Sequence, residues 1–412
     1  MNALEQELYH SFLFFLRERN SDLTSPGVGL IRDNTKNRSM ASIASVGFGL
    51  SAFVIGVENH YITKEEGLEL VKSTMRTFLE AEHFHGFYVH FLDMDTAKPF
   101  KKSEFSTIDT AILMNGLLVA DSYFDDSEIH QMFDVLFQRL DFRPFVKTFH
   151  EKEVLRMAYN PHVGGDYRQV SDDPWIYQWH MYAEQLSMYF LAAATDSMPE
   201  ETAIALYHGF ERNLGTYGPY QYYYSPTNAL FVYQYSHAWV DFKHIQTDDG
   251  IDWFENSRIA SLANRLWCID HQQEFPTLNQ SAWGVTACLT PKGYRNQCID
   301  PNDLNFDDIH VHGVFPPSGP LGSIVFTPNE SLEALEELEM QYQIAKGPYG
   351  FRDGIQLQED GSLWVSEHDI GINKGITCLM IDNYLHGTTW KYYMRHPRIQ
   401  KAMAKLHFQR RD

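Results

Sequence analysis

The chain is short of basic residues, and this shortage excludes several classes of partner. Lys and Arg number 33 against 54 Asp and Glu, which gives a formal net charge of −21. Binding of nucleic acids and of anionic membrane surfaces needs clustered Lys and Arg, so neither partner is expected. No apolar run is long enough to span a bilayer, so membrane insertion is not expected either. A neutral polar ligand fits this composition better.

Cysteines are also scarce, and their spacing argues against a thiolate metal site. None of the four forms a CxxC pair, and a disulfide framework from four cysteines would be sparse for 412 residues. We expect mostly buried thiols at Cys268, Cys288, Cys298 and Cys378.

Familiar catalytic signatures are missing as well. The chain has no GxSxG elbow, no Walker loop and no Rossmann glycine pattern worth weighing. Asp307, Asp308, His310 and His312 form DDIHVHG, whose spacing is not a known zinc-enzyme signature such as HExxH. We predict neither a metal nor a cofactor.

The first twenty residues bear on the compartment. They form an amphipathic segment with early acids, unlike a signal peptide. The chain is therefore expected to be cytoplasmic if it is complete as written, and periplasmic or secreted if a leader was removed. No low-complexity linker interrupts the sequence, which predicts one domain over residues 1–412.

Aromatic residues are abundant, with 23 Tyr, 28 Phe and 8 Trp. Such rings fill cores first, but a surplus suits sugars, whose C–H faces stack on rings while their hydroxyls bind polar groups. A carbohydrate is therefore a reasonable candidate ligand.

Helical periodicity recurs along the whole chain. Capping signals such as Thr63 with Glu66, and Asp173 followed by Pro174, mark helix starts. Residues 38–58 are apolar nearly all round and rich in small residues, which predicts an inner helix. The predicted helices are 3–19, 38–58, 63–82, 106–124, 126–140, 173–194, 199–213, 226–243, 252–272, 328–345, 372–386 and 396–408.

Strand patterns are few by comparison. Residues 85–93 alternate enough for a short strand, and residues 281–326 are expected to form long functional loops. Twelve helices in outer–inner pairs predict an all-α fold, an (α/α)6 barrel or toroid with a minor β-hairpin and long cleft-forming loops.

The stretch SEFSTIDTAIL, residues 103–113, is the most informative local motif. Ser106 and Asp109 have capping-box spacing, so a helix is predicted to begin here. Glu104 and Asp109 place two acids at the mouth of that helix, which suits chemistry on a neutral polar substrate. The alternative is that Asp109 only caps the backbone.

Eight blocks of sequence resemble one family in matching order. They are residues 29–59, 85–93, 103–118, 237–268, 283–288, 319–335, 346–354 and 370–390. Together they resemble the glycoamylase-like domain of bacterial carbohydrate enzymes, which includes glycoside hydrolase family 144, the bacterial endo-β-1,2-glucanases. The resemblance implies an (α/α)6 barrel, metal-independent hydrolysis of β-1,2-glucans with inversion, bacterial origin and, usually, export.

The resemblance also points to particular residues. Asp109 matches the acid of the family's S-T-I-D block, and Glu184 sits where the family places an acid on a helix facing the cleft. Relatives commonly read I-D-x-G where this chain has Asn373 in place of the acid. A neutral Asn373 cannot activate water, so Glu367 or Asp369 would have to substitute.

Inverting glycoside hydrolysis needs a protonated carboxylic acid and a carboxylate base on opposite sides of the sugar. Glu184 has apolar neighbours, which would raise its pKa and suit the acid, although a solvent-facing glutamate is the plain alternative. Glu104 and Asp109 lie at a helix start, whose positive end favours the ionised form and so suits the base.

Further residues are candidates for binding sugar. Asp353 follows Arg352, and an ion pair between them would keep the acid charged, in a substrate-binding or a purely structural role. Each aromatic alone is more often a core residue than a ligand contact. The candidates are Tyr177, Trp179, Trp283, Tyr349 and Phe351 for stacking, and Arg38, His237, Arg352, Asp353 and Asn373 for polar contacts.

The leading hypothesis is a β-1,2-glucan hydrolase with catalytic Glu184, Asp109 and Glu104. A transglycosylase on the same glucan and a non-catalytic glycan-binding protein remain alternatives, the latter because of Asn373. A polysaccharide lyase would need basic neutralising residues, which the acidic balance disfavours.

Overall fold

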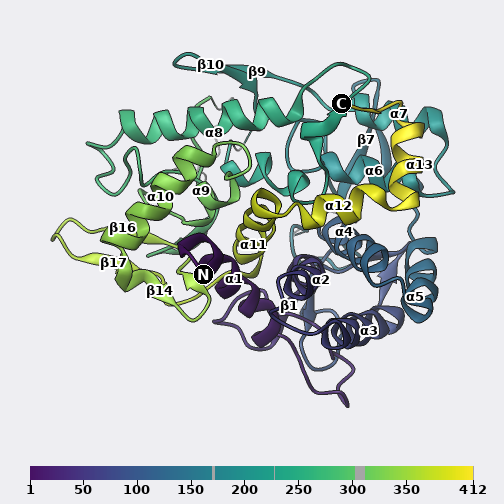
Figure 1. Cartoon of the computed structure of the whole chain (residues 1–412). Helices are drawn as coiled ribbons and strands as arrows, with labels where there is room; N and C mark the ends of the chain where they lie inside the picture. The colour runs from purple at the N-terminus through teal and green to yellow at the C-terminus, as the bar shows by residue number, and fades with distance from the viewer. Residues whose placement is uncertain (169–171, 227, 302–310, 412) are drawn as a thin grey trace.

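Helices dominate the computed structural model, which describes residues 1–168, 172–226, 228–301 and 311–411 (Figure 1). The α-helices within these residues are α1 (Ala3–Arg17), α2 (Ile43–Glu58), α3 (Lys64–Glu80), α4 (Thr107–Phe124), α5 (Ser127–Gln138), α6 (Leu186–Ala194), α7 (Glu200–Gly209), α8 (Trp253–Asp270), α9 (Ser318–Gly322), α10 (Pro328–Gln341), α11 (Gly371–Leu385), α12 (Thr388–Arg395) and α13 (Pro397–Lys405). The 3-10 helices are η1 (Arg143–Phe145), η2 (Leu230–Tyr233), η3 (Tyr235–Ala238), η4 (Phe242–His244) and η5 (Gln343–Ala345).

The strands are short and pair locally. They are β1 (Met40–Ser42), β2 (His83–Phe84), β3 (Phe87–Tyr88), β4 (Phe91–Asp93), β5 (Phe105–Ser106), β6 (Val146–Phe149), β7 (Lys152–Tyr159), β8 (Trp175–Gln178), β9 (Leu214–Tyr217), β10 (Tyr220–Tyr223), β11 (Ile245–Gln246), β12 (Cys288–Thr290), β13 (Gly293–Arg295), β14 (Lys346–Gly347), β15 (Gly350–Phe351), β16 (Ile355–Leu357), β17 (Leu363–Val365) and β18 (Gln409–Arg410).

The helices alternate between an outer and an inner position along the chain. The inner elements α2, α4, α6, η3 with η2, α9 and α11 contact one another in that order, and α11 returns to pack on α2. The outer helices α1, α3, α5, α7, α8 and α10 pack against neighbouring inner elements (Figure 1). The predicted outer–inner pairing of helices is therefore present.

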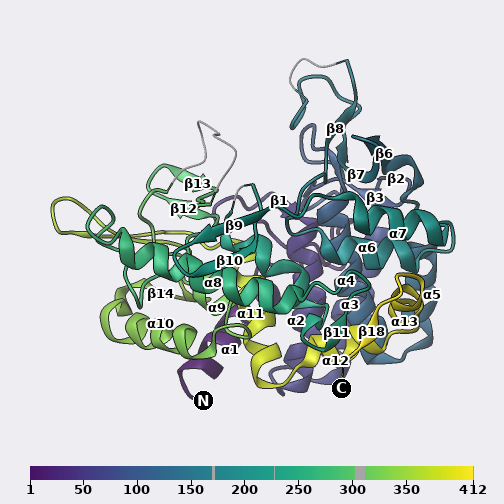
Figure 2. The same cartoon turned by 90° about the horizontal axis from the view of Figure 1, so that it is seen from above.

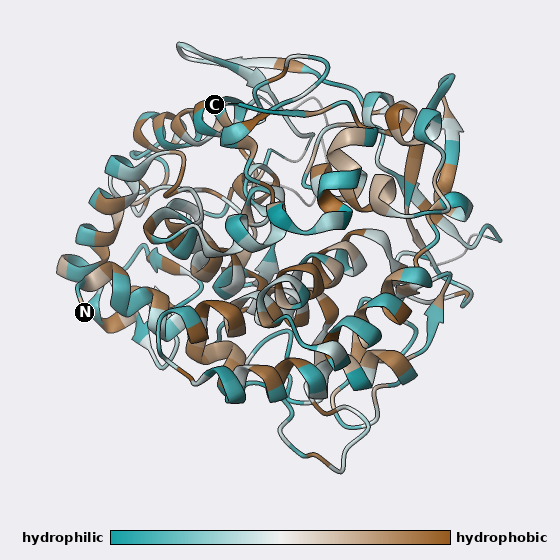
Figure 3. Cartoon of the chain, turned by 45° about the vertical axis from the view of Figure 1, so that its right-hand side comes forward, coloured by the Kyte–Doolittle hydropathy of each residue, from teal (hydrophilic) through white to brown (hydrophobic). Residues whose placement is uncertain are grey.

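Small residues explain how closely the inner helices approach. A Cβ on Gly47 of α2 would lie 2.3 Å from the carbonyl oxygen of Ile112, and one on Gly116 of α4 would lie 2.1 Å from the carbonyl oxygen of Gly47. Residues 43–57 of α2 are all buried, as expected for an inner helix. The outer helices carry hydrophilic and hydrophobic residues along their length, which suits elements with one face in solvent (Figure 3).

Two inner helices begin where a short strand ends, and both begin at the same end of the ring. Ser42, the last residue of β1, caps α2, and β1 pairs with β4. Ser106, the last residue of β5, caps α4, and β5 pairs with β7. Strands and loops gather at this end, whereas both termini lie at the other (Figure 2). The sheets thereby fix the first turns of the helices that face the cavity described below.

The helix predicted over 173–194 is wrong for its first half. Trp175–Gln178 forms β8 and pairs with β7, so only Leu186–Ala194 is helical. Gln185 caps α6 without a side-chain hydrogen bond, and the N–H of Ser187 instead donates to Oγ of Ser236 at 3.0 Å. Because the cap comes from a distant segment, local sequence could not locate this helix start.

Two further expectations about elements need correction. The helix predicted over 226–243 is a series of 3-10 helices among the residues described there, η2 to η4, and α9 and α12 were not predicted. The β content exceeds a minor hairpin, since the described residues form eight small sheets. The stretch 281–326 holds β12, β13 and α9 besides loops.

Two negative expectations concern the cysteines and the membrane. All four cysteines are buried free thiols, as predicted. None of the described helices combines the length and the apolar character that a bilayer crossing requires.

Candidate active site

A cavity of about 250 Å³ opens at the end of the ring where α2, α4 and α11 begin. First turns of these helices form its floor. The lining residues are Ala44, His90, Ser106, Ile108, Asp109, Ile112, Met157, Ala158, Tyr167, Ile176, Tyr177, Trp179, Glu184, Phe231, Tyr235, Tyr294 and Ile372. Largely apolar walls with a few convergent polar groups are typical of a small-molecule site.

Two ionisable groups on one side of this cavity, His90 and Asp109, form a row with Glu104 behind them. Nδ1 of His90 lies 3.0 Å from Oε1 of Glu104, and its Nε2 lies 3.5 Å from Oδ1 of Asp109. The ring also stacks on Phe91, with centroids 3.7 Å apart. Burial alone would lower the pKa of His90, but the charges of Asp109 and Glu104 outweigh it and raise that pKa to about 9.

Asp109 stands in the first turn of α4, as predicted. Its backbone N–H donates to Oγ of Ser106 at 3.3 Å, and the Ser106 hydroxyl donates to Oδ2 of Asp109 at 2.5 Å. This hydroxyl and the positive end of the helix both lie beside the carboxylate. Ser106 therefore caps the helix, and Asp109 faces the cavity.

Glu184 reaches the same cavity from another segment. Glu184 comes one residue before Gln185, the N-cap of α6, so it lies before a helix rather than on one. Its carbonyl oxygen accepts a hydrogen bond from Oγ of Ser236 at 2.7 Å. Burial, followed by the negative charge of Asp109, raises the pKa of Glu184 to about 7. One cavity thus holds Asp109 together with a second carboxyl, that of Glu184, whose pKa is raised to about 7.

Two of the predicted stacking residues line the cavity. Trp179 is buried, and its indole N–H donates to Oγ1 of Thr107 at 3.1 Å. Tyr177 is 67% exposed and has a backbone φ of 35°, uncommon for a bulky residue, which places an aromatic ring at the rim.

The other three predicted stacking residues are buried away from the lining. The indole N–H of Trp283 donates to the carbonyl oxygen of Glu330 at 3.3 Å. The hydroxyl of Tyr349 bonds to the carboxylate of Glu18. The backbone N–H of Phe351 donates to the carboxylate of Glu7, a group whose pKa burial raises to about 7. These rings lie in the core.

His237 and Arg38 also lie outside the lining residues. His237 is buried, its Nε2 lies 2.9 Å from Oγ of Ser257, and burial lowers its pKa to about 3. Arg38 is exposed in the segment before β1.

The expected ion pair between Arg352 and Asp353 does not form. Nη1 of Arg352 instead lies 2.7 Å from Oδ2 of Asp369, which is fully buried. Burial raises the pKa of Asp353 to about 7, so proximity in sequence did not keep this acid charged.

Asp353 and Asn373 form a buried pair beside the cavity. Nδ2 of Asn373 donates to Oδ1 of Asp353 at 2.7 Å and to the carbonyl oxygen of Ala287 at 3.1 Å. Oδ2 of Asp353 accepts from the backbone N–H of Leu289 at 2.6 Å. The pair joins α11 to the β12–β13 hairpin, which carries Tyr294 to the cavity.

Sequence reasoning missed five lining residues with an imidazole or aromatic ring: His90, Tyr167, Phe231, Tyr235 and Tyr294. His90 lies within a stretch that was predicted as a strand, so its side chain drew no attention. His90 lies just before β4, Glu104 lies just before β5, and the two side chains contact each other. The contact between His90 and Asp109 depends on where α4 begins. Only the fold brings these groups together.

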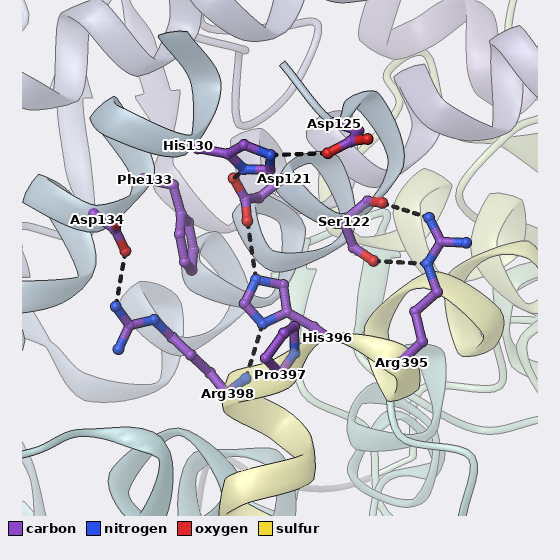
Figure 4. Close-up of a pocket in the computed structure, with 10 residues that line it drawn as sticks. All are labelled: Asp121, Ser122, Asp125, His130, Phe133, Asp134, Arg395, His396, Pro397 and Arg398. Carbon is purple, nitrogen blue, oxygen red and sulfur yellow. Dashed lines mark hydrogen bonds and ion pairs between the residues drawn. The ribbon is translucent and has the colours of Figure 1, made fainter. Parts of the chain in front are cut away.

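A wider hollow of about 680 Å³ lies near the C-terminal end of α4 (Figure 4). Asp121, His130 and His396 meet there, and Arg395 and Arg398 bond to Ser122 and Asp134. Its ionic side chains bond to one another, and the acid–base pair described above lies at the opposite end of the helix.

Two clusters of His and Asp residues are candidates for binding a metal ion. Asp307, Asp308 and His310 lie outside the described residues, and the backbone N–H of His312 donates to Gln297. Elsewhere in the described chain, His208, Asp248 and Asp249 come together, but Asp249 is already bonded by Arg212 and Thr247. The absence of a metal stays a prediction.

Comparisons with known proteins identify a matching family and similar structures. Residues 176–397 match the Glycoamylase family model, described as "Putative glucoamylase". A curated relative, the exo β-1,2-glucooligosaccharide sophorohydrolase (non-reducing end) of Parabacteroides distasonis, is 28% identical over 92% of this chain and 55% of its own length. The chain therefore spans about half the length of that relative.

Solved structures are similar over nearly the whole chain. The endo-β-1,2-glucanase of Chitinophaga pinensis, in complex with sophorotriose and glucose, has a TM-score of 0.83 and 25% identity, covering 99% of this chain and 98% of that one. The β-1,2-glucanase of Parabacteroides distasonis has a TM-score of 0.83 and 25% identity, covering 98% of this chain and 59% of that one.

Proposed function

Since the chain belongs to the glycoamylase-like family, we propose that it is a glycoside hydrolase acting on β-1,2-glucan or β-1,2-glucooligosaccharides with inversion. We further propose that residues 1–412 form one catalytic domain with the (α/α)6 barrel of that family. The observation that carries the proposal is that one cavity brings together Asp109 and Glu184, and that burial raises the pKa of Glu184 to about 7. The substrates named for the similar glucanases support the choice of sugar linkage.

In the proposed reaction Glu184 is the general acid. Its proton passes to the glycosidic oxygen as the bond to the anomeric carbon breaks, so the leaving sugar departs as a neutral alcohol. Burial keeps Glu184 protonated near neutrality, which is the state that this step consumes.

Asp109 is the proposed base. It takes a proton from water as the water oxygen attacks the anomeric carbon from the opposite face, directly or through a further water. Glu104 supports this side of the cavity through His90 rather than by lining it. The hydrolysis balances, because one water supplies the hydroxyl to one sugar and the proton to the other.

The surroundings of Asn373 favour the choice of Asp109 as the base over an acid at or near the start of α11. The amide of Asn373 is occupied by Asp353 and Ala287, and Asp369 is buried against Arg352. Neither Asp353 nor Asp369 lines the cavity. Neither of them therefore replaces, within the cavity, the acid that was expected at position 373.

The cavity size bears on the length of sugar bound. At about 250 Å³ it lies just below the roughly 300–1,000 Å³ of common small-molecule sites. Trp179 and Tyr235 supply apolar walls for sugar C–H faces, and Tyr177 supplies a ring at the rim. A short stretch of glucan is the proposed occupant.

Transglycosylation on the same glucan is the second candidate. In that reaction a sugar hydroxyl takes the place of water in accepting the glycosyl unit, and the same two carboxyls would serve it.

A glucan panel tests the proposal. The chain is incubated with β-1,2-, β-1,3-, β-1,4- and α-1,4-glucans, reducing ends are quantified, and product anomers are followed by NMR. We expect release of inverted product from the β-1,2-glucan alone. Longer oligosaccharides without new reducing ends would favour transglycosylation.

Glu184→Gln tests the acid. We expect turnover on β-1,2-glucan to fall about 10²–10⁴-fold, the usual contribution of a general acid, while substrate binding persists. Glu255→Gln, on outer helix α8 where Glu255 pairs with Arg258, is the matched control and should keep full turnover. Near-normal turnover of Glu184→Gln would remove the assigned role.

A further inference from the structure

The row formed by Glu104, His90 and Asp109 superficially resembles a catalytic dyad. A buried carboxylate contacts Nδ1 of His90, and the ring is among the residues that line the cavity. In many hydrolases such a carboxylate orients a neutral histidine that accepts a proton. Here, however, Nε2 meets a second carboxylate at 3.5 Å.

Four acids lie close enough to His90 to act on its charge. Glu104 belongs to the segment entering α4, Asp109 to the first turn of α4, and Asp33 and Asp166 to two further loops. A ring enclosed by carboxylates binds a proton tightly, so it is a poor proton acceptor near neutral pH. The same ring stacks on Phe91, which restricts its rotation.

We propose that His90 is a positioning residue whose imidazolium bridges Glu104 and Asp109, keeping Asp109 ionised and turned towards the cavity. This inference rests on the proposed function of Asp109 as base. Glu104, 3% exposed, holds the imidazolium in place from behind. Ser106 fixes the second oxygen of Asp109, so the carboxylate is held from two directions.

The charge of the bridge has a consequence across the cavity. The negative charge of Asp109 raises the pKa of Glu184, so the place at which His90 and Ser106 hold this carboxylate bears on the protonation of the general acid.

The first test does not depend on turnover. The full chain is labelled with ¹⁵N-histidine, and the His90 signals are assigned by their loss in His90→Gln. We expect the doubly protonated ring to persist to about pH 8, in keeping with a pKa of about 9, and to lose its proton at lower pH in Asp109→Asn. A ring that is neutral at pH 7 in the wild-type chain would overturn the proposal.

The second test is the pH profile of kcat/KM on β-1,2-glucan. In His90→Gln the acidic limb should move up by about one pH unit or more, because Asp109 loses a neighbouring cation. Below the limb this means a loss of about tenfold beyond any loss at the plateau. An unmoved limb in a folded variant would overturn the proposal.

Two further variants separate charge from structure. His90→Gln with Glu104→Gln leaves no stranded buried carboxylate, so folding is protected while the limb stays shifted. His396→Gln removes another buried histidine–carboxylate pair, at the opposite end of α4, and should lower Tm without moving the limb. A limb restored in the double variant would assign His90 a structural role only.

The two failures are distinguishable. If the wild-type chain hydrolyses no glucan, the proposed function fails, and the NMR titration alone decides whether the charged bridge exists. If hydrolysis occurs but His90 is neutral or the limb stays in place, only the role of His90 fails.

Discussion

The two ends of α4 carry the same residue types in opposite arrangements. At the start of the helix, His90 lies between two acids, Glu104 and Asp109. Near its end, Asp121 lies between two histidines, with His130 Nδ1 at 2.6 Å and His396 Nε2 at 3.0 Å (Figure 4). At ~1.5 Å per residue the two clusters are about 18 Å apart along the helix axis.

The cluster near the helix end is built for structure. Nδ1 of His396 accepts the backbone N–H of Arg398 at 3.2 Å, so its Nε2 carries the proton donated to Asp121. Both oxygens of Asp121 are thereby used, and α4, α5 and the start of α13 are joined. At the cavity, in contrast, Asp109 keeps its Oδ1 at 3.5 Å from its charged partner and faces open space. The candidate for chemistry is therefore recognised by a carboxylate oxygen that faces a cavity. Neither the residue types nor the size of the hollow identifies it.

The sharpest test of this comparison is Asp109→Asn. An amide cannot take a proton from water, so turnover on β-1,2-glucan should fall about 10²–10⁴-fold with little change in Tm. Steady-state kinetics and thermal unfolding measure the two effects. An Asp109→Asn variant that kept activity but unfolded early would reverse the contrast between the two clusters.

For the wild-type enzyme, activity should fall as pH rises through about 7, where Glu184 loses the proton it must donate.

The same substitution at the other end, Asp121→Asn, should act on stability instead. Losing charge-assisted partners in a buried pair costs about 1–3 kcal/mol, while kcat/KM per folded molecule should stay unchanged. Its hydrogen bond with Asp121 raises the pKa of His130, so the stability from this contact is fully present below the unfolded value and is lost as pH rises. Chemical unfolding at pH 5 and pH 9 should therefore show the larger loss at pH 5. A loss of turnover would contradict the structural reading.

Asn373→Asp should produce a stability loss of the opposite pH dependence. It would place a second carboxyl against Asp353 and the carbonyl of Ala287, so the two acids would share a proton. We expect unfolding to be easier by about 1–3 kcal/mol at pH 8, where both acids tend to ionise, and less affected at pH 5. The exchange Asp353→Asn with Asn373→Asp keeps one acid and should recover part of the loss. Equal stability at both pH values would argue against the buried pair.

The smallest expected effect is that of Tyr177→Ala at the cavity rim. Loss of one stacking face costs about 0.5–1.5 kcal/mol, or roughly two- to tenfold in KM, with kcat unchanged. Tyr384→Ala, an exposed tyrosine in the last turn of α11, is the control and should change neither constant. Equal effects of the two variants would mean that Tyr177 has no contact with sugar.

Sequence reasoning succeeded where the physics is local. The capping box of Thr63 and Glu66 and the start of α4 at Ser106 are confirmed, because caps lie within a few residues of the groups they satisfy. It failed at α6, whose first turn is satisfied by Ser236, and at the expected pair of Arg352 with Asp353, which gave way to Asp369. In both cases the deciding partner is distant along the chain.

The sequence by itself determined that this is a mainly helical chain with small-residue inner helices and a helix start at Ser106 flanked by Glu104 and Asp109. Periodicity, caps and charge are readable one segment at a time. The tertiary structure alone decided that Glu184 shares a cavity with Asp109, that His90 joins two acids, and that Asn373 is bound to Asp353. Those outcomes depend on which buried polar groups find partners once separate segments pack together, and desolvation makes that choice only in the folded chain.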